Sequence, residues 1–480
     1  SIHDHLTLFF MAPFIGHALL VVFKLTGSKD KENKKTMPKE WTDALGFAIV
    51  AATIIRVFFF EAFTIPTGSM EKTMLIGDYL FVNKLKYGAK IPQTPLSVPF
   101  VHNVLPGTTT KSYVEWFKND YMRLPGYGGI ERNDIMVFNW PAGDTVILHP
   151  DVIAHTYADI VRNEALRRAG GDILKFEQNP SLYLGIARKS IINGDAIANR
   201  TIERTGGIAT RPVDKKENYI KRCVGVAGDS LEVIQGVLYV DGVAEVKSPT
   251  AQFDYDFYLS ANFDDDVLKE HFDINFGNKH IYEDGSEVNL RYLAFDRNTG
   301  WYNKIERNEA ITISCPASVY EQLSQYSNVD SSKVVFKQKG HDYAAGGSLY
   351  PIFPNNKNFN WTQDNYGPFY LPKVGDKIEL TKHNFTFYRR AIEAYENNEV
   401  KIQEGNYIIN GELTTSYTFK QNYYWLMGDN RHGSADSRMW GYVPEDHVVG
   451  TASFVWFSKD ADLGWFSGGV RWSRIFSFIK

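Results

Sequence analysis

One serine of the chain lies where the backbone must turn. Ser69 follows the segment Ile65-Pro66-Thr67-Gly68. Pro66 fixes its own φ and keeps the residue before it out of the helical region, so the chain is extended there. Gly68 then allows a sharp bend directly ahead of the serine. Such a serine is either an ordinary turn residue that ends a helix or a nucleophile that needs a neighbouring base.

The base that such a serine needs can be a lysine. The chain has 12 histidines, but none falls in a pattern that resembles a Ser-His-Asp triad. A lysine can take their place when apolar surroundings disfavour its ammonium form and lower its pKa. Lys221 lies in a β-rich run beside Tyr219, Ile220, Cys223 and Val224. Taken alone, a lysine in such a strand is expected to point into water, so its assignment depends on the wider pattern.

Four segments of the chain resemble type I signal peptidases, the membrane serine proteases that remove secretory signal peptides. They extend from Arg56 to Asp78, from Arg132 to Pro141, from Tyr219 to Gly242 and from Tyr424 to Trp456. One segment alone would be a weak signal, whereas four in the family's order are a strong one. The resemblance implies an endopeptidase that cuts signal peptides from exported precursor proteins through an acyl-enzyme, without a cofactor or a metal ion.

The resemblance also implies which residues react. Ser69 matches the nucleophile of the family, and Lys221 matches its general base. The oxyanion would be stabilised by the backbone N–H of Ser69 and the hydroxyl of Thr67. Two donors aimed at the developing negative charge are what acyl transfer requires.

The segment from Gly428 to Gly441 would support the dyad. Ser434 matches a serine whose hydroxyl holds the lysine in position. Asp436 and Arg438 match an ion pair that braces the site; the alternative is a surface pair that contributes little to stability. His432 lies in the same segment, where a loop histidine is expected to be solvated.

The resemblance implies a specificity for small side chains. Shallow apolar pockets would admit small residues, usually Ala, directly before the cut and two residues further upstream. The substrate would lie extended and pair its backbone with an exposed strand. The residues that match the pocket positions are Ile65, Pro66, Met70, Met74, Tyr219 and Ile220.

One departure from the family leaves other classes open. Many members have a proline three residues after the serine, where this chain has Lys72. Ser69-Met-Glu-Lys72 is thereby a formal S-x-x-K motif, as in penicillin-binding proteins and β-lactamases. No Lys-Thr-Gly or Ser-Asp-Asn motif follows it, and the serine lies only a short way past the second apolar run, with no room for the strands and helices that precede S-x-x-K in that fold. A third alternative is an inactive, membrane-anchored β scaffold, which the joint presence of the matched residues disfavours.

Size and composition bound the class of protein. At 480 residues the chain exceeds one ordinary domain, so a core with insertions or two domains is expected. Apolar residues make up 44% and charged residues 22% of the chain, which is typical of a globular protein. A net charge of −4 gives no reason to expect nucleic-acid binding. A bridge between Cys223 and Cys315 is possible, but two unpaired, buried thiols are favoured.

The amino-terminal region predicts a membrane anchor, residues 1–62, with the lipid bilayer as its partner. Residues 6–25 and 44–60 are apolar runs close to the ~20 residues that span a bilayer. Neither run has the polar face, at a period of 3.6 residues, that a core helix of a soluble protein would show. The loop at 27–42 carries five lysines between Lys29 and Lys39, so the positive-inside rule makes it cytoplasmic. Everything after Phe60 then faces outward. With the resemblance, this implies a multi-pass protein of the bacterial inner (plasma) membrane, with its catalytic domain on the periplasmic or extracytoplasmic side.

The fold class expected is mainly β. A membrane-proximal, antiparallel β catalytic core would carry the site, with two transmembrane helices ahead of it. Helical spacing predicts a small helical insertion at 145–210, and many short β-like runs predict a second β subdomain at 245–395. The aromatic and basic tail, 463–480, either lies on a membrane surface or packs onto the core. The three parts of the core are then 63–144, 211–244 and 396–462.

Overall fold

The computed structural model describes most of the chain after the first predicted membrane run. The described residues are 37–106, 108, 110–147, 156–193, 208–246, 248–272, 274, 279–281, 287–289, 293–296, 301–304, 310–336, 351–460 and 469–479. The predicted span at 6–25 and most of the loop at 27–42 lie outside the described residues. Both therefore stay predictions.

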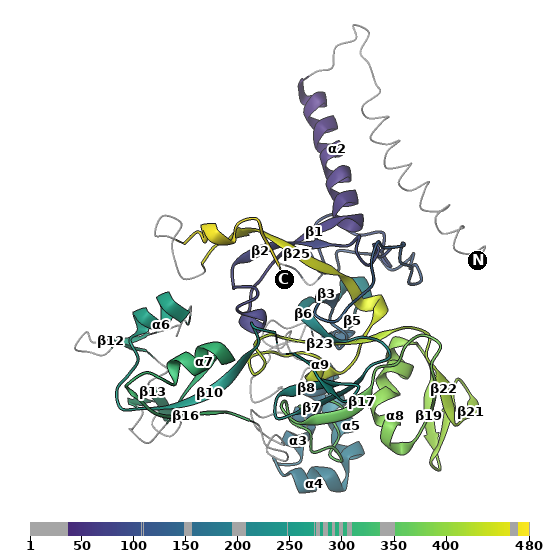
Figure 1. The fold of residues 1–480 in the computed structure, drawn as a ribbon. Helices are drawn as coiled ribbons and strands as arrows, with labels where there is room; N and C mark the ends of the chain where they lie inside the picture. The colour runs from purple at the N-terminus through teal and green to yellow at the C-terminus, as the bar shows by residue number, and fades with distance from the viewer. Residues whose placement is uncertain are drawn as a thin grey trace.

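Helix α2, Met37–Phe58, projects from the rest of the molecule (Figure 1). It covers most of the second apolar run and leads directly into strand β1, Phe60–Thr64. Large apolar side chains on α2, among them Trp41, Leu45 and Phe47, are exposed. None of the helices in the described part of the chain combines the length and the apolar character needed to cross a membrane.

The core is an antiparallel sheet, as predicted, and it has eight strands in the described chain. Its strand order is β1-β2-β25-β3-β6-β23-β24, and β26 pairs with β25. β3 and β23 are buried along their whole length. Register shifts interrupt the pairing of β25 with β2 and with β3, and such bulges bend a sheet. The strands are β2, Asp78–Asn83; β3, Ile135–Asn139; β6, Asn218–Gly225; β23, Tyr423–Met427; β24, Val443–Pro444; β25, Val448–Ser458; and β26, Ser477–Phe478.

A second sheet packs beside the first through aromatic side chains around Trp425. Its strand order is β17-β7-β8-β9, with the bounds Tyr366–Tyr370, Ser230–Ile234, Val237–Val240 and Val243–Ala244. β7 and β8 form a hairpin, with Gln235 and Gly236 both at positive φ in its two-residue turn. A similar hairpin joins β19, Val400–Gln403, to β20, Asn406–Ile409; β21, Glu412–Thr414, extends it.

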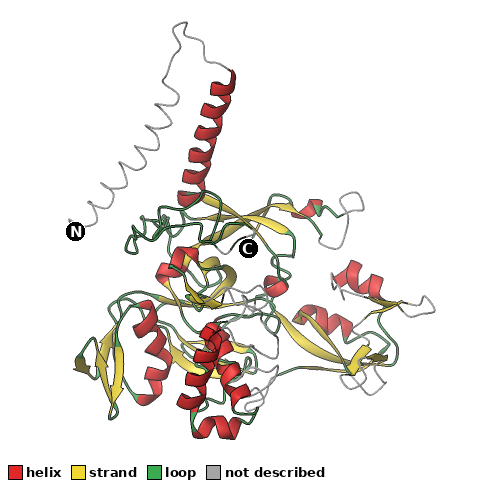
Figure 2. Cartoon of the chain, turned by 180° about the vertical axis from the view of Figure 1, so that it is seen from behind, coloured by secondary structure: helices red, strands yellow, loops and turns green. Residues whose placement is uncertain are grey.

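Three helices occupy the range predicted to be a helical insertion. They are α3, Tyr157–Arg168; α4, Ile173–Gln178; and α5, Pro180–Asn193. The side chains of Thr156 and Asp172 accept hydrogen bonds from the first backbone N–H groups of α3 and α4, which fixes where these helices begin. The helices share one hydrophobic cluster and lie together below the sheets in Figure 2. Strands β4, Thr145–Ile147, and β5, Ile208–Thr210, pair with each other at the two ends of this segment.

A separate small unit projects to one side of the core (Figure 1). Its strand β10, Gln252–Leu259, pairs with β15, Ile311–Pro316, and with β16, Val329–Val334. Helices α6, Asp265–Phe272, and α7, Ala317–Leu323, belong to it, and its buried side chains form a cluster of their own. Two short hairpins complete its described part: β11, Lys279–Ile281, with β12, Glu287–Asn289; and β13, Leu293–Asp296, with β14, Trp301–Lys304.

The remaining part of the predicted 245–395 subdomain packs elsewhere. Phe353, Tyr366 and helix α8, Lys382–Arg390, contribute to the cluster around Trp425, because β17 pairs with β7. A π-helical turn, Ala391–Tyr395, continues α8, and strand β18, Lys377–Glu379, pairs with β22, Ser416–Thr418. The inserted unit in the described chain is therefore 252–334, and 353–395 completes the core.

The described part of the tail, 469–479, packs onto the core sheet. β26 pairs with β25, and the guanidinium of Arg474 bonds to the buried carboxylate of Asp78. Trp472, Phe476 and Phe478 are nevertheless exposed. Of the two alternatives for the tail, packing onto the core is confirmed for these residues. The expectation of two unpaired, buried cysteines is confirmed too.

Candidate active site

Ser69 lies in a single 3-10 turn, Gly68–Met70, that follows β1. The chain is extended at Thr67, with φ −137° and ψ 153°, and then turns, which confirms the bend predicted ahead of the serine. Backbone hydrogen bonds from Ile65 N to Asp78 O and from Gly77 N to Ile65 O, both 2.9 Å, close the loop onto β2. The first N–H groups of a helical turn have no partner within the turn, so the serine is presented next to backbone donors.

Lys221 on β6 reaches the serine. Its Nζ donates to Ser69 Oγ at 2.7 Å and to the carbonyl of Ile220 at 2.9 Å. The residue is only 3% exposed, so the alternative of an isolated strand lysine that points into water does not apply. Burial lowers the pKa of Lys221 to about 8, because an ammonium loses its hydration there. The carboxylates of Asp436 and Asp429 act in the opposite direction but do not restore the usual value.

Ser434 lies against the serine turn without bonding to the lysine. Its Oγ is buried and has no hydrogen-bond partner within the described residues. A side-chain carbon on Gly428 would overlap Ser434 Oγ and would lie 2.6 Å from Ser69 O, so only glycine lets these groups approach. Catalytic hydrogen bonds are often unformed until substrate binds. The predicted role of Ser434 in holding Lys221 stays a prediction.

Asp436 and Arg438 form a buried ion pair. Arg438 donates to Asp436 through Nε at 2.8 Å and through a terminal nitrogen at 2.7 Å, and both side chains are at most 1% exposed. The reading as a surface pair is therefore wrong. Burial acts to raise the pKa of Asp436, but Arg438 outweighs it and holds that pKa below its usual value. Gly428 N donates to the same carboxylate at 3.0 Å, which ties the pair to the backbone beside Ser69.

A second buried ion pair was missed in the sequence. Arg222 donates to both oxygens of Asp429 at 2.8 and 2.7 Å, and Asp429 also accepts from Thr73 Oγ1 at 2.5 Å. The neighbouring Asn430 N donates to Ser69 O at 3.1 Å. These bonds connect the serine turn, the lysine strand and the loop after β23. Arg222 and Asp429 both lie in the matched segments, but only the fold shows that they meet.

The two other polar residues singled out by sequence face the inserted unit. Lys72 Nζ donates to the carbonyl of Phe272 at 3.0 Å, so the lysine of the S-x-x-K motif bonds to α6. The side chain of His432 is only 3% exposed, which makes the expectation of a solvated loop histidine wrong. Its Nδ1 accepts from Asp254 N at 3.0 Å, and its Nε2 lies 2.9 Å from a carboxylate oxygen of Asp364.

The predicted pocket residues divide by burial. Ile65, Met70 and Met74 are fully buried in one hydrophobic cluster, with Ile220 packed against it. They form a floor beneath the serine turn. Tyr219 stacks on Trp140 in the neighbouring cluster. Pro66 and Thr67 are exposed, next to the nucleophile.

Comparisons with known proteins agree with this geometry. The family model described as "Signal peptidase, peptidase S26" matches residues 38–257 and 373–457. A signal peptidase I of Haemophilus influenzae is 22% identical over 457 residues, which cover 94% of this chain and 80% of that protein. A signal peptidase I of Buchnera aphidicola is 23% identical over 427 residues, covering 89% and 77%. One of Rickettsia prowazekii is 30% identical over 164 residues, covering 31% and 55%.

Proposed function

The chain belongs to the signal peptidase family, peptidase S26, and we propose that Ser69 and Lys221 are its catalytic dyad. The protein is a serine endopeptidase that removes signal peptides from exported precursors. The observation that carries the dyad is the 2.7 Å contact between Lys221 Nζ and Ser69 Oγ. Burial of the lysine supports its use as a base, since the neutral amine is the form that accepts a proton.

Acylation begins when neutral Lys221 takes the proton of the Ser69 hydroxyl. The Oγ then attacks the carbonyl carbon of the residue before the cut, and the carbonyl oxygen becomes an oxyanion. The Ser69 N–H and the Thr67 hydroxyl stabilise this charge. The ammonium of Lys221 returns the proton to the leaving amine as the C–N bond breaks, which leaves an ester on Ser69.

Deacylation reverses the roles with water as the nucleophile. Lys221 takes a proton from the water molecule, which attacks the ester carbonyl. The second oxyanion uses the same two donors. The lysine then protonates Ser69 Oγ as the ester bond breaks, and the signal peptide leaves with a new carboxylate. Ser434 would hold the lysine during these transfers, and the pair of Asp436 and Arg438 keeps the loop in place.

The specificity for small side chains follows from the filled floor beneath the serine. Met70 and Met74 leave no deep hole there because they are fully buried. β1 is an edge strand of the sheet, so a substrate can add beside it in extended form. A precursor with Ala before the cut should be processed far faster than one with Leu or Phe, and equal rates would remove the pocket argument.

The protein is anchored in the bacterial inner membrane by the runs at 6–25 and 44–60, with its catalytic domain on the periplasmic side. The exposed apolar side chains of α2 and the five lysines between the runs support this placement. Protease added to spheroplasts should digest the domain after Phe60 and spare the loop at 27–42. Protection of the large domain would contradict this orientation.

The other enzyme class is disfavoured by geometry. A penicillin-binding mechanism needs a contact between the Lys72 amine and the Ser69 hydroxyl. Instead, the Lys72 amine bonds to the carbonyl of Phe272, and the Lys221 amine bonds to the Ser69 hydroxyl. An inactive scaffold is disfavoured by the 2.7 Å contact between Lys221 Nζ and Ser69 Oγ. The test is incubation of the full chain in detergent with a precursor that contains an Ala-X-Ala site. Mass spectrometry should find one cut after the second Ala, and Ser69→Ala should abolish it; cleavage by Ser69→Ala would refute the assignment.

A further inference from the structure

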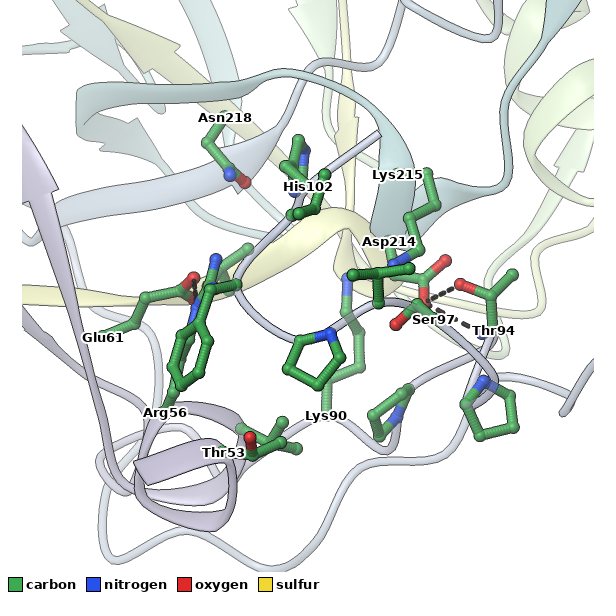
Figure 3. A pocket seen from close by; sticks show the side chains of 18 of the residues that line it. Thr53, Arg56, Glu61, Lys90, Thr94, Ser97, His102, Asp214, Lys215 and Asn218 are labelled. Carbon is green, nitrogen blue, oxygen red and sulfur yellow. Dashed lines mark hydrogen bonds and ion pairs between the residues drawn. The ribbon is translucent and has the colours of Figure 1, made fainter. Parts of the chain in front are cut away.

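A cavity of about 220 Å³ lies at the base of α2 (Figure 3). The last turns of α2, with Thr53 and Arg56, line one side, and the loop at 92–102 lines another. Asp214 and Lys215 contribute from the segment ahead of β6. A single water molecule needs about 10–15 Å³ of free volume, so the cavity admits a molecular group. Neither member of the catalytic dyad lines it, and the mechanism leaves it unused.

Basic side chains outnumber acidic ones around this cavity. Glu61 already pairs with two of the bases, since Arg56 Nε and Lys84 Nζ each lie 2.8 Å from its carboxylate. Positive charge in a partly enclosed space attracts an anion such as a phosphate. The basic lining residues are Arg56, Lys84, Lys90 and Lys215, and the acidic ones are Glu61 and Asp214.

Two of these lysines have donors to spare. Lys215 is 7% exposed, and its Nζ makes no hydrogen bond to any residue that the structure describes; it lies 5.3 Å from the centre of the Tyr113 ring. Lys90 Nζ donates to Asn139 Oδ1 at 2.7 Å and to Asp446 O at 2.9 Å, which leaves one of its three N–H groups. A phosphate in the cavity would accept from both lysines.

One carboxylate oxygen of Asp214 has no hydrogen-bond donor among the described residues. Its Oδ2 accepts from Thr94 N at 2.9 Å and from Thr94 Oγ1 at 2.8 Å. Its Oδ1 is buried and has no partner among the described residues. A buried carboxylate oxygen is costly to leave unpaired, so the group that completes this site must carry an O–H or N–H donor as well as a negative charge.

The surroundings of the cavity are apolar and exposed. Val98 and Phe100, from the loop that lines the cavity, are both exposed, and Val57 of α2 lines it as well. A polar cavity beside exposed apolar side chains fits a ligand with a charged head and hydrocarbon chains.

We propose that this cavity binds the headgroup of a membrane phospholipid. The phosphate bonds to Lys215 and Lys90, and a headgroup hydroxyl or ammonium donates to Asp214 Oδ1. Glycerol and ethanolamine headgroups carry such a donor, whereas choline carries none. The acyl chains leave the cavity along the exposed side chains of Val98 and Phe100. The proposal rests on the membrane anchoring through α2 that is proposed above, and it does not involve the dyad.

The test is native mass spectrometry of the full chain in detergent with short-chain phospholipids of glycerol, ethanolamine and choline headgroup. We expect the glycerol and ethanolamine lipids to remain bound, and choline lipid to bind about tenfold more weakly, as the loss of one hydrogen bond to a charged group implies. Lys215→Gln should weaken the two donor-bearing lipids by a similar factor. The matched control is Lys111→Gln, since Lys111 Nζ lies 5.5 Å from the centre of the same Tyr113 ring but does not line the cavity.

Equal retention of all three lipids, or equal retention by the Lys215 and Lys111 variants, would overturn the proposal. A further arm adds glycerol 3-phosphate without acyl chains. Binding as strong as that of the lipids would assign the cavity to a soluble phosphate compound and refute the lipid. Peptide cleavage is measured in the same samples and should be unchanged in Lys215→Gln. Loss of cleavage by the wild type would contradict the proposed dyad, not the lipid site.

Discussion

Adding a single methyl group at Gly428 should lower the catalytic rate while the protein still folds. A Cβ there would overlap Ser434 Oγ and would lie 2.6 Å from the carbonyl oxygen of Ser69, well inside the 3.0 Å below which an atom must move. The Ser434 hydroxyl can rotate away, but Ser434 Cβ, at 2.5 Å from the added carbon, cannot. The Ser69 carbonyl is backbone, and Asn430 N holds it at 3.1 Å, so Gly428→Ala must shift the turn that carries the nucleophile relative to the segment that carries Ser434.

The expected loss is large for kcat and small for KM. A displacement of about 1 Å at a reacting group can cost about 10²-fold in rate, and overpacking of this kind destabilises by about 1–3 kcal/mol. Gly428→Ala should therefore remain folded while kcat on a signal-peptide substrate falls about 10²-fold. The assays are steady-state kinetics and thermal unfolding of the same preparation.

The matched control is Gly185→Ala in helix α5. Nothing lies within 4 Å of a Cβ at that position, and alanine favours a helix over glycine by about 0.5–1 kcal/mol. That variant should keep full activity and gain stability. Full activity of Gly428→Ala would refute the argument that the site depends on close approach at this glycine.

The pH dependence, the bracing ion pair and the tautomer-specific contact of His432 give three further predictions. kcat/KM should rise with pH through about 8, because burial lowers the pKa of Lys221 to about that value and only the neutral amine accepts a proton; a profile that falls over this range would contradict the base. Arg438→Ala leaves the buried Asp436 without its ion-pair partner and should destabilise the fold by about 3–5 kcal/mol. As a control, Arg389→Ala removes an exposed ion pair and should destabilise it by less than about 1 kcal/mol. Equal melting temperatures of the two variants would contradict this prediction. His432→Ala removes the hydrogen bond between the loop after β23 and Asp254 of the inserted unit. Limited proteolysis should therefore cut within 252–334 faster than in the wild type. An unchanged rate would show that this hydrogen bond does not hold the unit in place.

The reacting residues could be predicted from the sequence because each lies within a short matched segment. The bend at Ser69 follows from Pro66 and Gly68, and the hairpin turns follow from local residue types. The partner of a buried charge, by contrast, cannot be predicted from a short segment. Arg222 and Asp429 are 207 residues apart, and the order of strands β6 and β23 in the sheet decides that they meet.

Burial of polar groups was the feature that the sequence could not reveal. The sequence around His432 is typical of a solvated loop. In the structure, Asp254 and Asp364, from two distant segments, contact both ring nitrogens of His432. The predicted unit at 245–395 shows the same limit, since alternating β-like runs do not say which sheet each strand joins. Its last part packs around Trp425, so replacing 245–385 by a linker would remove part of the core.

The central claim is that Lys221, and not Lys72, activates Ser69. The most direct measurement is kcat/KM of Lys72→Ala and Lys221→Ala on one signal-peptide substrate, with Ser69→Ala as the reference. We expect Lys72→Ala to remain active, since its amine bonds to Phe272. Lys221→Ala should lose at least the roughly 10²–10⁴-fold that base catalysis supplies and behave like Ser69→Ala, because members of one dyad act as a unit. An inactive Lys72→Ala beside an active Lys221→Ala would contradict the assignment.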